Sequence, residues 1–141
     1  MTEQVSSIPQ QRLLSEATVQ ELQLELIRRT QFNAFHGEKI YQALLAHREL
    51  WQAVMLDRFC FSNPGKLPSA GLIKLRDLQD NLWNADTLYI LTPDIASARQ
   101  LAHIAEDRWG GMAQVHDDPD EVARALGSGY PEPVIVSVWW D

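Results

Sequence analysis

The sequence predicts an α/β protein in which three N-terminal helices pack on a small, three-stranded and largely parallel βαβαβ sheet, with an α+β fold as the alternative. Apolar residues recur at helical spacing up to residue 84, and beyond it short apolar runs alternate with helical segments. The charge changes at the same place, because residues 86–141 contain ten carboxylates and three arginines and so carry the whole net charge of −7. We therefore predict a flexible N-terminus (1–12) and one domain (13–141) with a helical segment (13–84) and a βαβαβ segment (85–141).

Two amphipathic helices are expected first, over 15–35 and over 38–59. Gly37 separates them, since glycine is a frequent helix terminator. The apolar residues that define the two faces are Val19, Leu22, Leu24, Leu26 and Ile27 in the first helix and Ile40, Leu44, Trp51, Val54 and Met55 in the second. Pro64 and Pro68 then mark a loop, and Ser69 is the expected N-cap of a third helix. The leucines of that third helix are Leu72, Leu75, Leu78 and Leu82.

A strand is predicted over 87–91, and a helix follows it directly. Thr92 is the expected N-cap and Pro93 the first helical residue, a position at which proline loses no hydrogen bond. Apolar residues continue at helical spacing as far as Trp109, and Gly110 can supply the left-handed conformation that ends the helix.

The remaining elements are a weak strand over 112–115, a short helix and a closing strand over 133–140. The helix is expected to begin after Asp118, which is followed by Pro119, and to stop at Gly127. The closing run is β-branched and almost continuously apolar, which is typical of a strand covered on both faces. Because strands alternate with helices, we expect parallel pairing through right-handed crossovers, with the N-terminal helices covering the sheet.

The composition excludes several classes of partner. With 45% hydrophobic and 22% charged residues over 141 positions, the chain can bury a substantial core. A net charge of −7 disfavours nucleic acid, which is bound through clustered Lys and Arg. No apolar stretch approaches the ~20 residues of a membrane helix, and the opening residues lack a secretion-signal pattern. We therefore expect a cytoplasmic protein that binds neither nucleic acid nor membranes.

No cofactor or metal is predicted. Cys60 is the single cysteine and stands between two phenylalanines, so it is expected to be a buried, unreactive thiol. His47 falls on the apolar stripe of the second helix, and no other metal-ligating residue is spaced to join it. The sequence contains no catalytic signature that we recognise, and this favours a non-enzymatic role.

The acidic C-terminal part suggests a binding module for a basic protein. A negative field speeds encounter with a basic partner, and an exposed aromatic side chain slows its release. Asp118, Asp120 and Glu121 also have a structural explanation, as cap and first-turn acids that complement the helix dipole. The residues predicted for this surface are Asp117, Asp118, Asp120, Glu121 and whichever of Trp139 and Trp140 points outward.

Two other functions stay open. In the first, the protein is a small enzyme or ligand-binding domain with a cleft at the carboxyl ends of its strands, formed by Thr92, Asp94, His116 and Asp117. In the second, it is a structural homodimer that pairs the apolar faces of its first two helices. The sequence by itself does not decide among the three.

Overall fold

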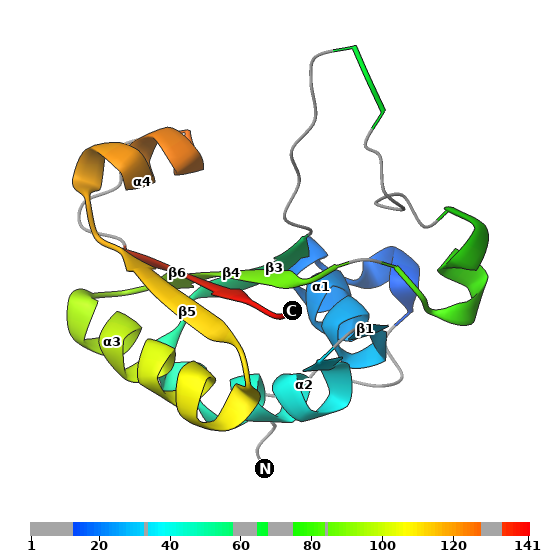
Figure 1. The fold of residues 1–141 in the computed structure, drawn as a ribbon, viewed down its shortest axis with the longest axis horizontal. Helices are drawn as coiled ribbons and strands as arrows, with labels where there is room; N and C mark the ends of the chain where they lie inside the picture. Colours follow the sequence, from blue (N-terminus) through cyan, green and yellow to red (C-terminus); the bar gives the residue numbers. More distant parts are fainter. Residues whose placement is uncertain (1–12, 33, 58–64, 68–74, 84, 128–133) are drawn as a thin grey trace.

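The main sheet has four antiparallel strands (Figure 1). The computed structural model describes residues 13–32, 34–57, 65–67, 75–83, 85–127 and 134–141. The strands are β3 (Ala53–Asp57), β4 (Thr87–Thr92), β5 (Met112–His116) and β6 (Val134–Trp139), in the spatial order β3-β4-β6-β5. Every neighbouring pair is antiparallel. The predicted three-stranded, largely parallel sheet is therefore wrong, and the fold is α+β.

The strand order shows where that prediction failed. β4 and β5 run in the same direction, as the strand–helix–strand pattern indicates, and α3 (Ile95–Ile104) connects them. They are not neighbours, because β6 lies between them and pairs antiparallel with both. This is a split βαβ unit, in which a gap of one strand is left open and later filled. The prediction assumed that a helical connection places two strands side by side, which the physics of the crossover does not require.

The second predicted helix is much shorter than expected. α2 spans Gly37–Ala46 and is followed by the 3-10 helix η2 (Arg48–Leu50). The indole N–H of Trp51 donates to the carbonyl of Leu44, 2.8 Å away, and so satisfies one of the carbonyl groups that a helix end leaves unpaired. The chain can then leave the helical conformation without a buried, unsatisfied acceptor.

β3 occupies the rest of the segment that was predicted as helical. Val54 and Leu56 are buried and Met55 between them is exposed, which is the two-residue period of a strand. The spacing of Trp51, Val54 and Met55 also fits a helical stripe, so short apolar runs of this kind do not distinguish the two structures.

The first predicted helix is also shorter. α1 spans Val19–Arg29 and begins with a capping box, in which Thr18 and Glu21 satisfy each other's backbone N–H groups. A short antiparallel pair, β1 (Gln31–Phe32) and β2 (Phe35–His36), then reverses the chain into α2.

Gly37 permits the close contact between α1 and α2. A Cβ atom at this position would lie 2.0 Å from the carbonyl oxygen of Ile27 and 2.3 Å from that of Thr30. The N–H of Gly37 donates to the same Thr30 carbonyl at 2.9 Å. Any larger side chain would push the start of α2 away from the end of α1.

The third predicted helix does not form an amphipathic layer. A 3-10 helix, η3, covers Leu75–Asp80, and the predicted part over 68–74 lies outside the described residues. Leu75, Leu78 and Leu82 are all exposed. The described part of this segment thus leaves the sheet to be covered by other elements.

The predicted helices of the C-terminal part are confirmed. α3 continues into a π-helix, η4 (Ala105–Trp109), and ends at Gly110, which is left-handed. α4 (Pro119–Leu126) starts after Asp118 and ends at the left-handed Gly127. One detail is wrong: the N-cap of α3 is Asp94, whose carboxylate accepts from the N–H of Ser97, whereas Thr92 is still part of β4.

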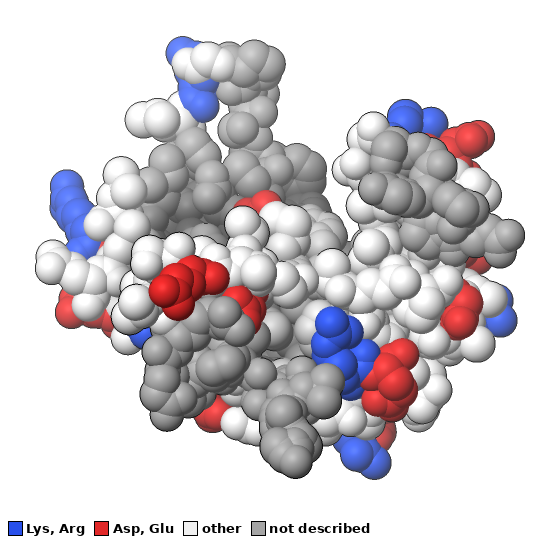
Figure 2. All heavy atoms as spheres, turned by 180° about the vertical axis from the view of Figure 1, so that it is seen from behind, with Lys and Arg blue, Asp and Glu red and all other residues white. Residues whose placement is uncertain are grey.

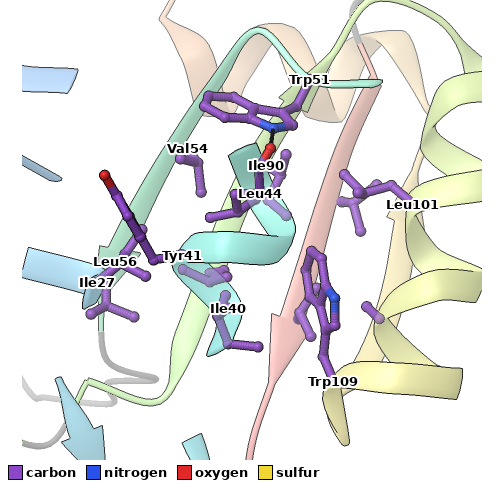
Figure 3. Close-up of a cluster of buried hydrophobic side chains, with 14 of the residues drawn as sticks. Ile27, Ile40, Tyr41, Leu44, Trp51, Val54, Leu56, Ile90, Leu101 and Trp109 are labelled. Carbon is purple, nitrogen blue, oxygen red and sulfur yellow. Dashed lines mark hydrogen bonds between the residues drawn. The ribbon is translucent and has the colours of Figure 1, made fainter. Parts of the chain in front are cut away.

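The hydrophobic core lies on one side of the sheet. Figure 1 shows α2 and α3 on that side and α4 on the other, with α1 beside β3. Figure 3 shows labelled core side chains from α1, α2, α3, η4, β3 and β4, which belong to one cluster of buried residues. Trp140 stacks edge-on against Phe35, with ring centroids 4.8 Å apart, and its indole N–H donates to the carbonyl of Trp109. None of the described helices is long and apolar enough to span a bilayer.

Candidate functional site

The other side of the sheet, here called the outer face, is only partly covered. Strand register assigns its side chains to three rows that each cross all four strands in the order β3, β4, β6, β5. The rows are Ala53, Leu91, Ile135 and His116; Met55, Tyr89, Ser137 and Gln114; and Asp57, Thr87, Trp139 and Met112. Met55, Tyr89 and Met112 are among the exposed large hydrophobic residues of the described chain.

A hollow of about 350 Å³ lies over the first two rows. Its floor is formed by the sheet, one wall by α1 and the other by Leu126 of α4. The described residues that line it are Val19, Gln20, Gln23, Ala53, Val54, Met55, Tyr89, Ile90, Leu91, Leu126 and Ile135. Most of these are apolar, and the polar atoms come from two glutamine amides and a phenol. A mostly apolar concavity with a few polar groups is the usual form of a small-molecule site.

The α1 wall is fixed to the edge of the sheet. The amide of Gln20 donates to the carbonyl of Val54 at 2.8 Å and accepts from its N–H at 2.9 Å, which mimics the pairing of a neighbouring strand. Gln23 accepts from the N–H of Leu56 at 2.9 Å. These contacts hold the wall in place and also cover an edge strand that could otherwise pair with another chain.

A serine, a histidine and a glutamate meet at the side of the outer face near β5. The Nε2 atom of His116 lies 2.8 Å from the Oγ atom of Ser137. The Nδ1 atom of the same ring faces the Oε1 atom of Glu121 at 3.8 Å. The His116 side chain is 23% exposed and that of Glu121 is 55% exposed. Ser137 and His116 are thus within hydrogen-bond distance of each other, and Glu121 lies close to the other ring nitrogen but beyond hydrogen-bond distance.

Local structure explains why these three residues converge. His116 is the last residue of β5, and Ser137 lies diagonally opposite it on β6, on the same face of the sheet. Asp118, two residues after His116, is the N-cap of α4, and Pro119 is the first residue of that helix. Glu121 is in the first turn of α4 and is therefore carried back over the histidine.

Tyr89 stands between the hollow and Ser137, its direct partner across β4 and β6. Partial burial raises the pKa of its phenol, and the negative charges of Asp57 and Asp86 raise it further. Tyr89 therefore remains a hydrogen-bond donor throughout the neutral pH range.

The acidic residues predicted as a binding surface lie around the start of α4. Asp118 accepts from the N–H of Asp120 at 3.0 Å, so it serves as the helix cap, and Glu121 faces His116. Asp117, Asp118, Asp120 and Glu121 are all exposed. Figure 2 shows acidic and basic side chains interspersed on the face seen from behind. The binding of a basic protein stays a prediction.

The two C-terminal tryptophans point to opposite faces, as alternation requires. Trp140 is 1% exposed and belongs to the core. Trp139 is half-buried on the outer face, in the row of Met112. Trp139 is therefore the one whose side chain a partner could reach.

The predicted cleft at the strand carboxyl ends does not come together as one group. Thr92 is fully buried, and its hydroxyl donates to the carbonyl of Val134 at 2.7 Å, on the side of the core. His116 is paired with Ile135, one residue further along β6, and hence points to the outer face. Asp94 caps α3. Its carboxylate accepts a hydrogen bond from the backbone N–H of Ser97, and this hydrogen bond lowers the pKa of the carboxyl group. Asp117 follows β5 directly.

The sequence predicts His116 and Glu121 in two different candidate sites, and it does not predict Ser137, Tyr89, Gln20 or Gln23. One signal was present: Ser137 is the single polar residue in the apolar run 134–140, at a position that alternation assigns to the same face as Ile135 and Trp139. No comparable signal marks the glutamines, because their partners are backbone atoms of β3.

Comparison of the chain with family models, with curated proteins and with solved structures gives no match. The function is therefore inferred from the geometry of the outer face.

Proposed function

We propose that the protein binds a small, mostly apolar molecule in the hollow on the outer face of the sheet. The observation that carries the proposal is the hollow itself, about 350 Å³ in volume, with a sheet floor and walls from α1 and α4. This volume lies within the range of roughly 300–1,000 Å³ that is usual for small-ligand sites.

The lining supports a ligand with an apolar body. Met55, Leu91 and Ile135 form most of the floor, and Leu126 closes one side. Burial of apolar surface here would supply most of the binding free energy, at roughly 25 cal/mol per Å² of area removed from water. Tyr89 and the cluster of Ser137 and His116 at the border of the hollow provide hydrogen bonds for one polar end.

A neutral fluorescent probe tests the proposal. N-phenyl-1-naphthylamine emits strongly in apolar sites, and we expect a saturable rise in its fluorescence with the wild-type protein. Ala53→Phe fills the hollow from its β3 side and should weaken the binding of the probe at least tenfold. Met112→Phe is the matched control, because it enlarges an outer-face residue of the other edge strand that does not line the hollow.

Two results would reject the proposal. One is the absence of saturable binding by wild-type protein that circular dichroism shows to be folded. The other is a dimer in sedimentation that Ala53→Phe dissociates, since the hollow would then be occupied by a second copy of the chain and not by a small molecule.

A further inference from the structure

Ser137 and His116 make the contact between hydroxyl and imidazole that nucleophilic hydrolysis uses, and Glu121 lies 3.8 Å from the other ring nitrogen. We infer that the protein hydrolyses carboxylic esters, with Ser137 as nucleophile, His116 as general base and Glu121 as a positioning residue. This inference rests on the proposed function, because the hollow would hold the apolar part of the ester.

The nucleophile and the base are already within hydrogen-bond distance. The 2.8 Å between Ser137 Oγ and His116 Nε2 lies within the reach expected of a general base and the proton that it removes. Ser137 is in the interior of β6, between two strands, so its backbone is held by pairing on both sides. A nucleophile on a rigid element keeps its geometry better than one on a loop.

Glu121 is the group placed to favour the tautomer of the histidine that this chemistry needs. Its carboxylate lies 3.8 Å from Nδ1, and a shortening of this distance by rotation of the exposed side chain would let it accept the Nδ1 proton. Nε2 is then free to accept from the hydroxyl of Ser137. The same carboxylate stabilises the imidazolium that forms during the reaction.

Two hydrogen-bond donors flank the nucleophile. Gln114 is directly opposite Ser137 on β5, and Tyr89 is directly opposite it on β4. Side chains that face each other across antiparallel strands have Cβ atoms about 4.5–5.5 Å apart. A side-chain amide or phenol can stabilise the oxyanion of a tetrahedral intermediate. Tyr89 keeps its proton at neutral pH because the ordinary pKa of a phenol is about 10, and partial burial raises the pKa of Tyr89 further.

Ser137 does not line the hollow, but two of its outer-face neighbours do. Tyr89 and Ile135 line the hollow, and each is next to Ser137 on the outer face. Tyr89 is directly opposite Ser137 on β4, and Ile135 is two residues before Ser137 on β6. An ester whose acyl or alcohol part fills the hollow would therefore place its carbonyl carbon beside Ser137.

The reaction balances with water as the only co-reactant. Ser137 Oγ bonds to the acyl carbon as its proton passes to His116 Nε2; the bond to the alkoxy oxygen then breaks, and the alcohol leaves with that proton. Water next attacks the acyl-serine and gives one proton to His116. The serine oxygen takes this proton as the carboxylic acid departs.

The first test measures hydrolysis of 4-nitrophenyl butyrate by the full chain. We expect a rate above that of buffer and of free imidazole, and a loss of 10²- to 10⁴-fold in kcat/KM for Ser137→Ala and for His116→Gln. His103→Gln is the matched control, since this exposed histidine is on α3. Undiminished turnover by Ser137→Ala would overturn the assignment of the nucleophile.

The second test labels the nucleophile directly. An alkyl fluorophosphonate should phosphonylate Ser137, releasing fluoride, and peptide mass spectrometry should locate the adduct there. Labelling should disappear in His116→Gln, because the serine is then not activated. An adduct spread over several serines, or none on Ser137, would contradict the inference.

Glu121→Gln tests the positioning residue. It should lower kcat about tenfold or more while KM stays within twofold, and Glu121→Asp should restore part of kcat. A change in KM alone would assign Glu121 to binding instead.

The two proposals fail in different ways. If Ser137→Ala binds N-phenyl-1-naphthylamine as the wild type does and neither protein hydrolyses the ester, the binding function stands and the catalytic inference falls. If the wild type binds no probe, the proposed function itself is rejected.

Discussion

The two faces of the main sheet are built from the same strands but differ in what covers them. On the inner face, Leu88, Ile90, Val136 and Val138 are fully buried; α3 packs on β4 and β6, and residues of α2 and η4 belong to the same core cluster. On the outer face, the intervening residues of β4 and β6 are mostly half-buried or exposed, and a hollow separates α1 from α4.

This difference shows how a small domain can separate stability from function. Because strand side chains alternate, each strand gives every second residue to the core and the others to the candidate site. Ser137 lies between Val136 and Val138, so a site residue is held by two core residues. Substitutions on the outer face should thus change binding more than stability, and those on the inner face the reverse.

The pair Trp140 and Trp139 gives the largest expected contrast. Trp140→Ala removes a ring that packs on Phe35 and a hydrogen bond to the carbonyl of Trp109, and it should lower the free energy of unfolding by about 3–5 kcal/mol. Trp139→Ala, on the half-buried outer face, should cost less than half as much. Urea unfolding measures both, and equal losses would mean that the two faces are equally packed.

The glutamine contacts at the edge of β3 should have a smaller effect. Gln20→Ala leaves the N–H and C=O of Val54 without their partners and should cost about 1–3 kcal/mol. It also exposes an edge strand, so we expect concentration-dependent association in sedimentation. Gln42→Ala on α2 is the control, because the Gln42 amide is exposed and donates to the exposed side chain of Glu38; there we expect a change within about 0.5 kcal/mol.

Local signals predicted the C-terminal elements well, and strand partners much less so. Asp118, Pro119, Gly110 and Gly127 are cap and terminator residues that act within one helical turn, and the structure places α3 and α4 where they indicate. The position of β6 between β4 and β5 depends on contacts with both, which no local pattern encodes. β3 was missed for a related reason. Its short apolar run fits the period of a helix as well as that of a strand, and only its pairing with β4 decides between the two.

The candidate site was predicted only in part, and for the same physical reason. His116 is at the end of a strand, as the sequence predicts, but its expected partner Thr92 points to the opposite face. That outcome depends on register, because Thr92 pairs with Val134 and His116 with Ile135. A shift of one residue exchanges the two faces of a strand, so the members of an outer-face site cannot be assigned without the pairing.

The outer face should also respond to alkaline pH. The pKa of Tyr89 is raised in the folded protein, so its contribution to stability is complete below the unfolded pKa of about 10 and is lost as the pH rises through the folded pKa. The unfolding free energy should therefore fall above about pH 10, and Tyr89→Phe should reduce that fall. Urea unfolding at pH 8, 10 and 11 measures the effect, and an identical decline in both proteins would exclude Tyr89 as its source.

The smallest effect is expected on the solvent side of α1, which belongs to neither face. Glu25 pairs with Arg28 and with Arg29, and the hydrogen bond from Arg28 is the main reason that the pKa of its carboxyl is lowered. Ion pairs near the surface contribute roughly 0–1 kcal/mol, and since the Glu25 and Arg28 side chains are 21% and 28% exposed, Glu25→Gln should cost about 1 kcal/mol at pH 7.

Because the folded pKa of Glu25 lies below the unfolded value of 4.5, the contribution is complete above that pH and disappears as the pH falls through the folded pKa. Wild type and variant should thus differ at pH 7 and converge in acid. High salt should also reduce the difference at pH 7, since exposed charges are screened. A difference that persists in acid and in salt would show that the Glu25 side chain acts through packing against α1 and not through its charge.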